Sequence, residues 1–181
     1  INQGVAHLYL GGPTGFATTP ARTFANHTGH GAFEQFGWDV ADAGDFDGDG
    51  RPDLAVLARF DDRPNTFGPE YVNPADCPGT VNDPAAVFVF RGVASGLPSA
   101  QPAFVFYGPQ GGQIAEQVAG GFDYDGDGFS DLLVGGPSWD RPGRVNVGGF
   151  AIISGRPAHP AGITVICAAA YGWLGLAAND Q

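Results

Sequence analysis

The sequence predicts an all-β fold, and three observations lead to that prediction. Glycine and proline contribute 30 and 15 of the 181 residues, and they bound short apolar segments along the whole chain. This regular spacing of glycine and proline is typical of strands joined by turns. No segment between these residues carries apolar side chains at helical three-and-four spacing for ten residues. The segments also recur in sets, which indicates a repeated unit made of strands.

The expected strands are four to seven residues long, and each is bounded by glycine, proline or acidic residues that favour turns. Most are rich in valine, isoleucine, leucine or phenylalanine, which suit a pleated and partly buried surface. In chain order they are residues 4–10, 22–25, 38–43, 53–58, 86–90, 103–107, 116–121, 131–136, 149–154, 162–168 and 173–178.

A repeated unit of four strands organises these segments. "VADAGDFDGDGRPDLAVLA", residues 40–58, aligns with "VAGGFDYDGDGFSDLLVGG", residues 118–136, and each is followed by an apolar strand that ends in glycine. A third copy begins at "YGWLGLAAND", which places Asp180 in line with the first aspartate of each acidic stretch. The excess length of the first copy lies in residues 59–85, so these residues are expected to form an inserted loop.

Two acidic stretches, "DFDGDGRPD" at 45–53 and "DYDGDGFSD" at 123–131, share one arrangement of carboxylates. Aspartates at positions 1, 3, 5 and 9, with glycines at 4 and 6, let a tight turn aim oxygens inward, and a carbonyl at position 7 adds another. This all-oxygen set is what calcium prefers, whereas magnesium holds a stricter octahedral geometry. The sequence therefore predicts two Ca²⁺ sites. The expected ligands are Asp45, Asp47, Asp49, Asp53 and the carbonyl of Arg51, then Asp123, Asp125, Asp127, Asp131 and the carbonyl of Phe129.

The acidic stretches fit an EF-hand or a metal-free turn less well. An EF-hand requires a bidentate glutamate at position 12, where this chain has Val56 and Val134, and it requires flanking helices. A solvated acidic turn without metal does not account for the same spacing occurring twice at the same place in the repeat. The expected role of the ion is structural, because the stretches contain only ligands and no base or nucleophile beside an open position. Asp180 is the possible start of a third metal loop.

The residues that carry these patterns resemble a known family. "FGWDVADAGDFDGDGRPDLAV" at 36–56, with "LLVGGP" at 132–137 and "FRGVASGLPSA" at 90–100, is similar to an FG-GAP repeat, the blade unit of the β-propeller of integrin α chains and of many bacterial surface and secreted proteins. The second copy departs from that pattern, with Ile114 and Ala115 where phenylalanine and glycine are expected. The resemblance implies FG-GAP β-propeller blades of four antiparallel strands.

The resemblance also implies a domain organisation of under three blades. Residues 1–35 would be the last two strands of a preceding blade, 36–110 a blade with a calcium loop and the inserted loop, 111–170 a second blade with a calcium loop, and 171–181 the first strand of a further blade. A propeller needs about four to eight blades. We therefore expect the edge strands to be completed by the rest of a longer chain or by identical copies.

Composition excludes several classes of partner. The chain has nineteen acidic residues and eight basic residues, all of them arginine, which gives a net charge of -11. Nucleic acids and anionic membrane surfaces are bound by clustered positive charge, so neither is expected as a partner. No apolar run approaches the roughly 18 residues needed to cross a bilayer, so no membrane insertion is expected.

Some features bear on location. Extracellular calcium modules work with dissociation constants of about 10⁻⁴ to 10⁻³ M, which external fluid saturates and cytosol does not, so a secreted, extracellular or cell-surface protein is expected. Cys77 and Cys167 are either a disulfide or two unrelated thiols. "NHT" at 26–28 fits the acceptor pattern for N-glycosylation at Asn26.

Two classes of function remain open from sequence, and a third possibility concerns assembly. The first is a non-catalytic module for adhesion, recognition or assembly through protein or glycan contacts. Its ligand face would include the inserted loop, where Phe67 and Tyr71 offer aromatic surface. The second is a propeller-fold polysaccharide hydrolase or lyase, in which Glu34, Glu70 and Glu116 could meet in space. The third is a repeating subunit of an extracellular filament.

Overall fold

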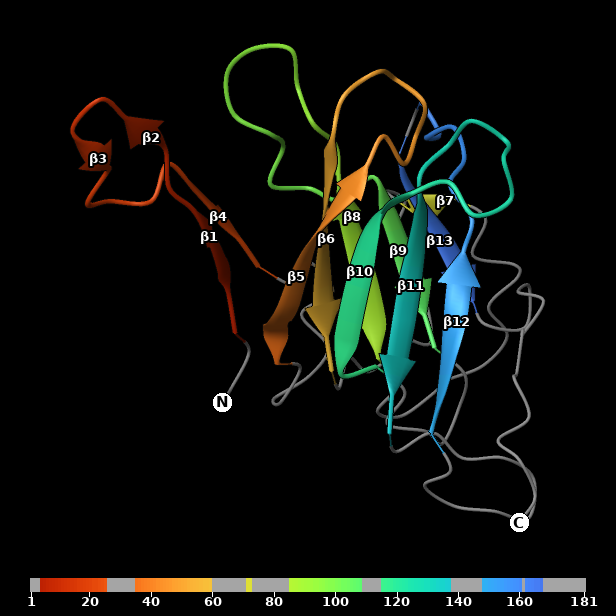
Figure 1. The fold of residues 1–181 in the computed structure, drawn as a ribbon. Coiled ribbons are helices and arrows are strands. Elements are labelled where there is room, and N and C mark those ends of the chain that lie inside the picture. Colours follow the sequence, from red (N-terminus) through yellow and green to blue (C-terminus); the bar gives the residue numbers. More distant parts are fainter. Residues whose placement is uncertain are drawn as a thin grey trace.

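The computed structural model describes residues 4–25, 35–59, 71–72, 85–108, 115–137, 148–160 and 162–167. All regular elements in these residues are strands, so the prediction of an all-β fold is confirmed (Figure 1). The strands are β1 (Ala6–Leu8), β2 (Gly11–Gly12), β3 (Gly15–Phe16), β4 (Arg22–Phe24), β5 (Phe36–Gly44), β6 (Asp53–Ala58), β7 (Tyr71–Val72), β8 (Ala86–Phe90), β9 (Phe104–Tyr107), β10 (Gln117–Phe122), β11 (Asp131–Gly136), β12 (Gly149–Ile153) and β13 (Ile163–Cys167). Within the described part, the structure contains no helix long and apolar enough to cross a membrane.

The first repeat supplies four of the six strands of the larger sheet, starting from its β5 edge. Strands β5, β6, β8 and β9 pair in chain order and antiparallel, with Val56 opposite both Val40 and Phe88. Every residue of β8 and β9 is buried, as is all of β6 except Leu54. These strands read as continuous apolar runs because both faces of the sheet are covered.

One strand differs from expectation. The repeat predicts residues 162–168 as a strand of the second blade, 111–170, whereas β13 pairs in parallel with β9 of the first repeat, with Thr164 opposite Phe104. Strand β13 carries apolar side chains on both faces, and Ile163 and Ile166 belong to different core clusters. A strand of this kind buries more apolar surface beside the fully buried β9 than at the edge of a sheet with one open face. Beyond β13, β7 adds a further parallel pair from within the inserted loop.

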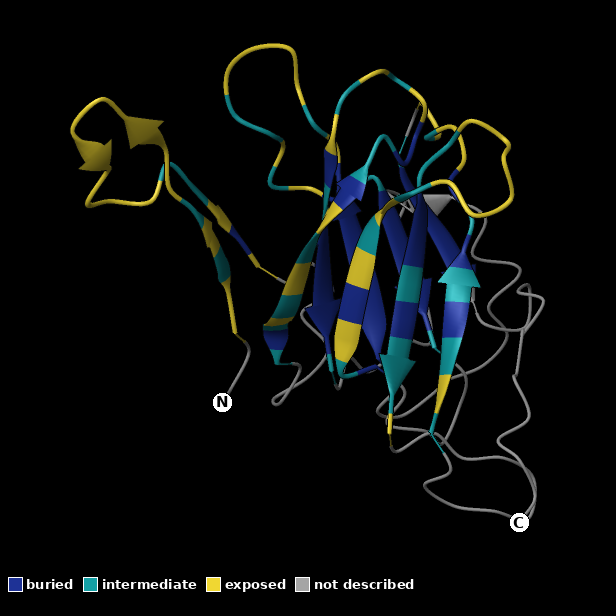
Figure 2. Cartoon of the chain, in the orientation of Figure 1, coloured by how far each residue is buried: buried dark blue, intermediate teal, exposed yellow. Residues whose placement is uncertain are grey.

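The second repeat forms a smaller antiparallel sheet of β10, β11 and β12 that lies against the larger one (Figure 1). Its inner strand β10 approaches β5 so closely that glycine is required. A Cβ at Gly120 would lie 2.7 Å from the Asp42 carbonyl oxygen and 2.7 Å from Leu132 Cδ2. On β10, buried Val118 is flanked by exposed Gln117 and Ala119, because one face of this sheet remains open (Figure 2).

The core consists of two clusters, one on each face of the larger sheet. The cluster between the sheets joins residues of the first repeat, such as Leu57 and Phe104, to Leu132 of the second. The cluster on the far face contains Phe88 and Phe24, and the ribbon of β1 and β4 covers it. The first repeat is thus held between its two neighbours in sequence. The sequence did not predict the short β2–β3 hairpin or β7.

Replacing Phe88 by alanine tests this arrangement. The ring is fully buried and makes an edge contact with Phe36 at a centroid distance of 5.2 Å. We expect Phe88→Ala to lower the free energy of unfolding by about 3 to 5 kcal/mol, because it removes transfer energy and leaves a cavity. Urea unfolding measures the change. Phe16→Ala is the matched control, since Phe16 is 82% exposed, and its effect should stay within about 0.5 kcal/mol. Equal losses in the two variants would contradict the described core.

Candidate metal centre

The two acidic stretches form corresponding loops at the same end of neighbouring sheets. Loop 1, residues 45–53, joins β5 to β6, and loop 2, residues 123–131, joins β10 to β11. The repeat therefore places both carboxylate sets where the first two strands of a unit turn.

Loop 1 is shaped by hydrogen bonds from its own backbone to its carboxylates. The Gly50 N–H donates to Asp45 Oδ2 at 2.9 Å, and the Asp49 N–H donates to Asp47 Oδ1 at 3.2 Å. Gly48 and Gly50 have φ of +74° and +84°, a left-handed conformation that favours glycine. This confirms the expected tight turn with glycines at positions 4 and 6.

Loop 2 contains the same two hydrogen bonds at equivalent positions. The Gly128 N–H donates to Asp123 Oδ2 at 3.0 Å, and the Asp127 N–H donates to Asp125 Oδ1 at 3.2 Å. Gly126 and Gly128 also have positive φ, +78° and +93°. The internal duplication seen in the sequence is therefore a duplication of local structure.

The ninth aspartate closes each loop onto the strand beyond it. Asp53 Oδ2 accepts from the N–H groups of Phe46 at 3.1 Å and Asp47 at 3.3 Å, while its Oδ1 accepts from the Gly92 N–H at 2.8 Å. Burial raises the pKa of Asp53 to about 6, although the Gly92 hydrogen bond opposes this rise. The sequence predicts Asp53 as a ligand, and the structure shows it as the residue that fixes the loop.

Asp131 makes the same closure in loop 2. Its Oδ2 accepts from the Tyr124 N–H at 2.6 Å and its Oδ1 from the Gly155 N–H at 3.0 Å. Gly92 and Gly155 thus occupy equivalent places after the third strand of their repeats.

These two glycines are functional residues that the prediction did not include. A Cβ at Gly92 would lie 2.1 Å from the Pro52 carbonyl oxygen, and one at Gly155 would lie 2.4 Å from the Ser130 carbonyl oxygen. No side chain fits at either place without a backbone shift. The available signal was the glycine that ends the third strand in both copies of the repeat.

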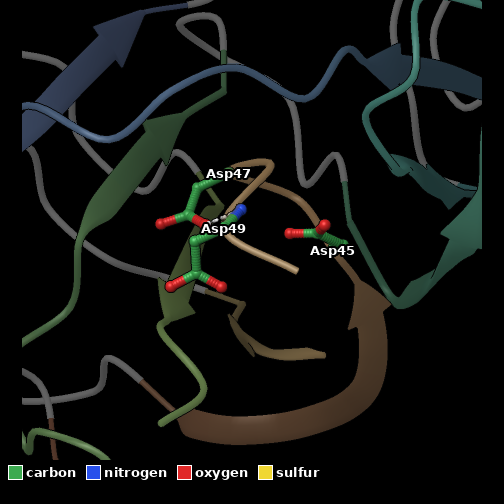
Figure 3. Close-up of side chains that lie close together, drawn as sticks. All are labelled: Asp45, Asp47 and Asp49. Carbon is green, nitrogen blue, oxygen red and sulfur yellow. Dashed lines mark hydrogen bonds between the residues drawn. The ribbon is translucent and has the colours of Figure 1, made fainter. Parts of the chain in front are cut away.

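The carboxylates of loop 1 form a set suited to a hard cation. Asp45, Asp47 and Asp49 each offer an oxygen, and these oxygens lie within 4.8 Å of one another. Figure 3 shows the three side chains gathered at the loop. Asp45 Oδ1 and Asp49 Oδ1 are buried without a hydrogen-bond partner. Burial also raises the pKa of Asp47, so the charge of this set is costly to the fold.

In loop 2 the corresponding set is Asp123, Asp125 and Asp131, whose oxygens also lie within 4.8 Å of one another. Asp123 and Asp125 are exposed and Asp131 is buried. Asp127 lies outside this set, and its Oδ1 accepts a hydrogen bond from the Phe129 N–H at 2.9 Å.

The carbonyl groups expected as ligands are those of Arg51 and Phe129, and the structure shows other contacts for both residues. Arg51 Nη1 lies 3.0 Å from Asp49 Oδ2. The Phe129 ring packs on Gly48, where a Cβ would lie 2.4 Å from Phe129 Cε1. A second arginine that the prediction missed, Arg91, pairs with Asp49 at 3.1 Å and with Asp47.

Loop 1 also forms part of the contact between the two sheets. The Ser130 N–H donates to the Asp45 carbonyl and the Arg156 N–H to the Phe46 carbonyl, both at 2.9 Å. The Phe46 ring is fully buried and packs edge-on against Phe104 at 5.2 Å. At the equivalent position of loop 2, Tyr124 is 61% exposed. The same residue position is therefore a buried contact in one repeat and an open surface in the other.

Several predicted residues lie outside the described part of the chain. They are Asn26, Phe67, Cys77 and Asp180, together with Glu34 and Glu70 of the enzyme alternative. Tyr71 belongs to β7 and Cys167 to β13, and for these two residues the structure describes the backbone only. Glu116 accepts a hydrogen bond from Arg59 at 2.8 Å, and that guanidinium lies 4.6 Å from the centre of the Trp38 ring.

Comparison with known proteins relates the second repeat to a known repeat family. Residues 115–153, which span β10, loop 2, β11 and β12, match the FG-GAP repeat family. This chain contains an FG-GAP repeat. The chain is also similar to integrin alpha-5 of Xenopus laevis, with 32% identity over 113 residues. That match covers 60% of this chain and 9% of the integrin's length. The FG-GAP resemblance predicted from the sequence is thus confirmed.

Replacing Gly155 by alanine tests the closure of the FG-GAP loop. The added methyl group would meet the Ser130 carbonyl oxygen, so Gly155→Ala should lower the free energy of unfolding by about 1 to 3 kcal/mol. Denaturant unfolding measures the loss. Gly11→Ala is the control, because a Cβ there meets only the Phe16 ring, at 3.9 Å. A Gly155→Ala variant as stable as the Gly11→Ala variant would show that the close approach is absent.

Proposed function

We propose that this chain is a calcium-stabilised β-propeller module of an exported protein, which acts without catalysis in adhesion, recognition or assembly through protein or glycan contacts. One observation carries the calcium part of the proposal. Buried carboxylate oxygens of Asp45 and Asp49 have no hydrogen-bond partner, in a loop whose geometry recurs in the second repeat. Calcium would take these unpartnered oxygens as ligands.

The arrangement of the loop aspartates indicates the role that bound calcium would have. Asp53 and Asp131 hold the loops to the segments that follow the third strands through hydrogen bonds. The remaining carboxylates repel one another, and their repulsion opposes that placement. A ligand that binds only the folded state stabilises it by mass action. We therefore assign bound calcium a structural role and not a catalytic one.

The propeller part of the proposal rests on how successive repeats meet. The β1–β4 ribbon, the β5–β9 strands and the β10–β12 sheet lie face to face in sequence order. Phe46 lies in the core cluster that joins the first and second repeats, whereas its counterpart Tyr124 is exposed. We propose blades at 1–35, 36–110, 111–170 and 171–181, although β13 of the third segment pairs with β9 of the second. We also propose that a further blade or an identical copy covers Tyr124.

Export and a binding role are supported by similarity. FG-GAP repeats resemble blades of integrin α chains and of bacterial surface and secreted proteins, and the chain is 32% identical to integrin alpha-5 over 113 residues. The calcium concentrations outside cells suit weak loop sites of this kind. The inserted loop, 59–85, is the segment we propose as a contact surface, because long loops on a rigid scaffold often carry binding.

Removal of calcium is the first test. At a calcium concentration about 100 times the dissociation constant, one site adds about 2.7 kcal/mol of stability. For a chain of this size, that gain raises Tm by roughly 5 to 10 °C. Calorimetry in excess calcium and then in EGTA measures the shift, with magnesium as the control cation. Identical melting curves in calcium and in EGTA would contradict the proposal.

The second test separates the two sites. Asp47→Asn removes one buried carboxylate charge from loop 1, and Asp125→Asn removes the equivalent charge from loop 2. Each variant should bind one calcium ion where the unaltered chain binds two, because each loop holds its own ligand set. Isothermal titration calorimetry gives the stoichiometry. If both variants still bind two ions with unchanged affinity, these aspartates are not ligands.

A further inference from the structure

The two loops share the backbone hydrogen bonds that shape and close them but face different side chains at one equivalent position. The residue before the closing glycine is Arg91 in the first repeat and Ser154 in the second. Arg91 pairs through Nη2 with Asp49 Oδ2 at 3.1 Å and through Nε with Asp47. Ser154 Oγ donates to Asp125 Oδ2 at 3.4 Å. A cation and a neutral hydroxyl therefore occupy the same place.

The position-7 residues increase this difference. Arg51 pairs with Asp49 at 3.0 Å, whereas Phe129 stands at the equivalent place in loop 2. Two guanidinium groups thus face the four aspartates of loop 1, which leaves a formal charge of -2. Among the described residues, the ion pairs include none to loop 2, so its four aspartates keep a formal charge of -4.

We propose that Arg91 is a built-in counter-cation that competes with calcium for Asp47 and Asp49, so that loop 1 binds calcium more weakly than loop 2 and stays folded without it. This inference rests on the proposed calcium function. A fixed positive charge a few ångströms from a calcium ion repels it, and the oxygens that pair with the guanidinium must be shared or released. Because arginine keeps its proton at all physiological pH values, this counter-charge is permanent.

The position of loop 1 in the fold agrees with this role. Its Asp45 and Phe46 carbonyls accept hydrogen bonds from the second repeat, and the Phe46 ring lies in the core between the sheets. The Asp47 side chain is fully buried, while that of its ion-pair partner Arg91 is 45% exposed. Loop 1 is needed to hold the sheets together at any calcium level. Loop 2, whose Asp123 and Asp125 are exposed, is the loop that responds to calcium.

A pair of reciprocal substitutions tests the proposal on the full chain. Calcium is titrated calorimetrically into Arg91→Ser, which copies loop 2, and into Ser154→Arg, which copies loop 1. Asp125→Asn and Asp47→Asn backgrounds isolate loop 1 and loop 2, respectively. We expect loop 2 of the unaltered chain to bind at least about tenfold more tightly than loop 1. Arg91→Ser should strengthen loop 1 about tenfold, and Ser154→Arg should weaken loop 2 by a similar factor.

A second readout separates this role from a merely structural one. In EGTA, Arg91→Ser should lower Tm because the counter-charge is lost, although the same change strengthens calcium binding. Arg91→Lys keeps the charge but loses the two-nitrogen contact, so the affinity of loop 1 should stay closer to that of the unaltered chain than to that of Arg91→Ser. Opposite signs for metal-free stability and calcium affinity support the proposal.

Three results would overturn the proposal. They are equal affinities of the two loops in the unaltered chain, an unchanged loop 1 affinity in folded Arg91→Ser, and an unchanged loop 2 affinity in Ser154→Arg. If neither loop of the unaltered chain binds calcium, the proposed function itself fails, and that result is distinct because it appears before any substitution. Should Arg91→Ser not fold, Ser154→Arg and Arg91→Lys still decide the question.

Discussion

One carboxylate at the end of each acidic loop joins three separate stretches of backbone, and the geometry of the rest depends on it. Asp53 accepts hydrogen bonds from N–H groups at the start of loop 1 and from the N–H of Gly92, which lies beyond β8. Hydrogen bonds to a charged acceptor contribute about 1.5 to 3 kcal/mol each, so this closure can offset part of the cost of burying the acid. Asp131 closes loop 2 in the same way. This closure, with the backbone hydrogen bonds to the other aspartates, brings the carboxylates of each loop together.

Much of the fold could be predicted from the sequence because its signals are local. The apolar runs and the turn residues around them gave most strands within a few residues, and the duplicated acidic stretches gave both loops. Positive φ at Gly48 and Gly126 follows directly from the spacing of carboxylates that must point inward. These features depend on residues that are close together in the sequence, so the sequence alone indicates them.

The missed features depend on partners far apart in the chain. Strand β13 lies where it does because β9 has an open edge, and no pattern within residues 163–167 indicates which strand it will pair with. Arg91 lies 42 residues from Asp49, beyond the inserted loop, so nothing in the acidic stretch indicates that a guanidinium faces it. The β2 and β3 strands have two residues each, too few for a periodic signal. Electrostatic contacts across a repeat have no sequence periodicity that reveals them.

The close approach at Gly120 has a consequence for the order of the repeats. In the alignment of the two copies, the first repeat carries Asp42 where the second carries Gly120. A Cβ at that place lies 2.7 Å from the carbonyl oxygen of the preceding inner strand. A first repeat placed after another first repeat would therefore press a carboxylate side chain into the backbone of its neighbour. The two repeats therefore cannot exchange places, because only the repeat with glycine at this position can pack closely behind another.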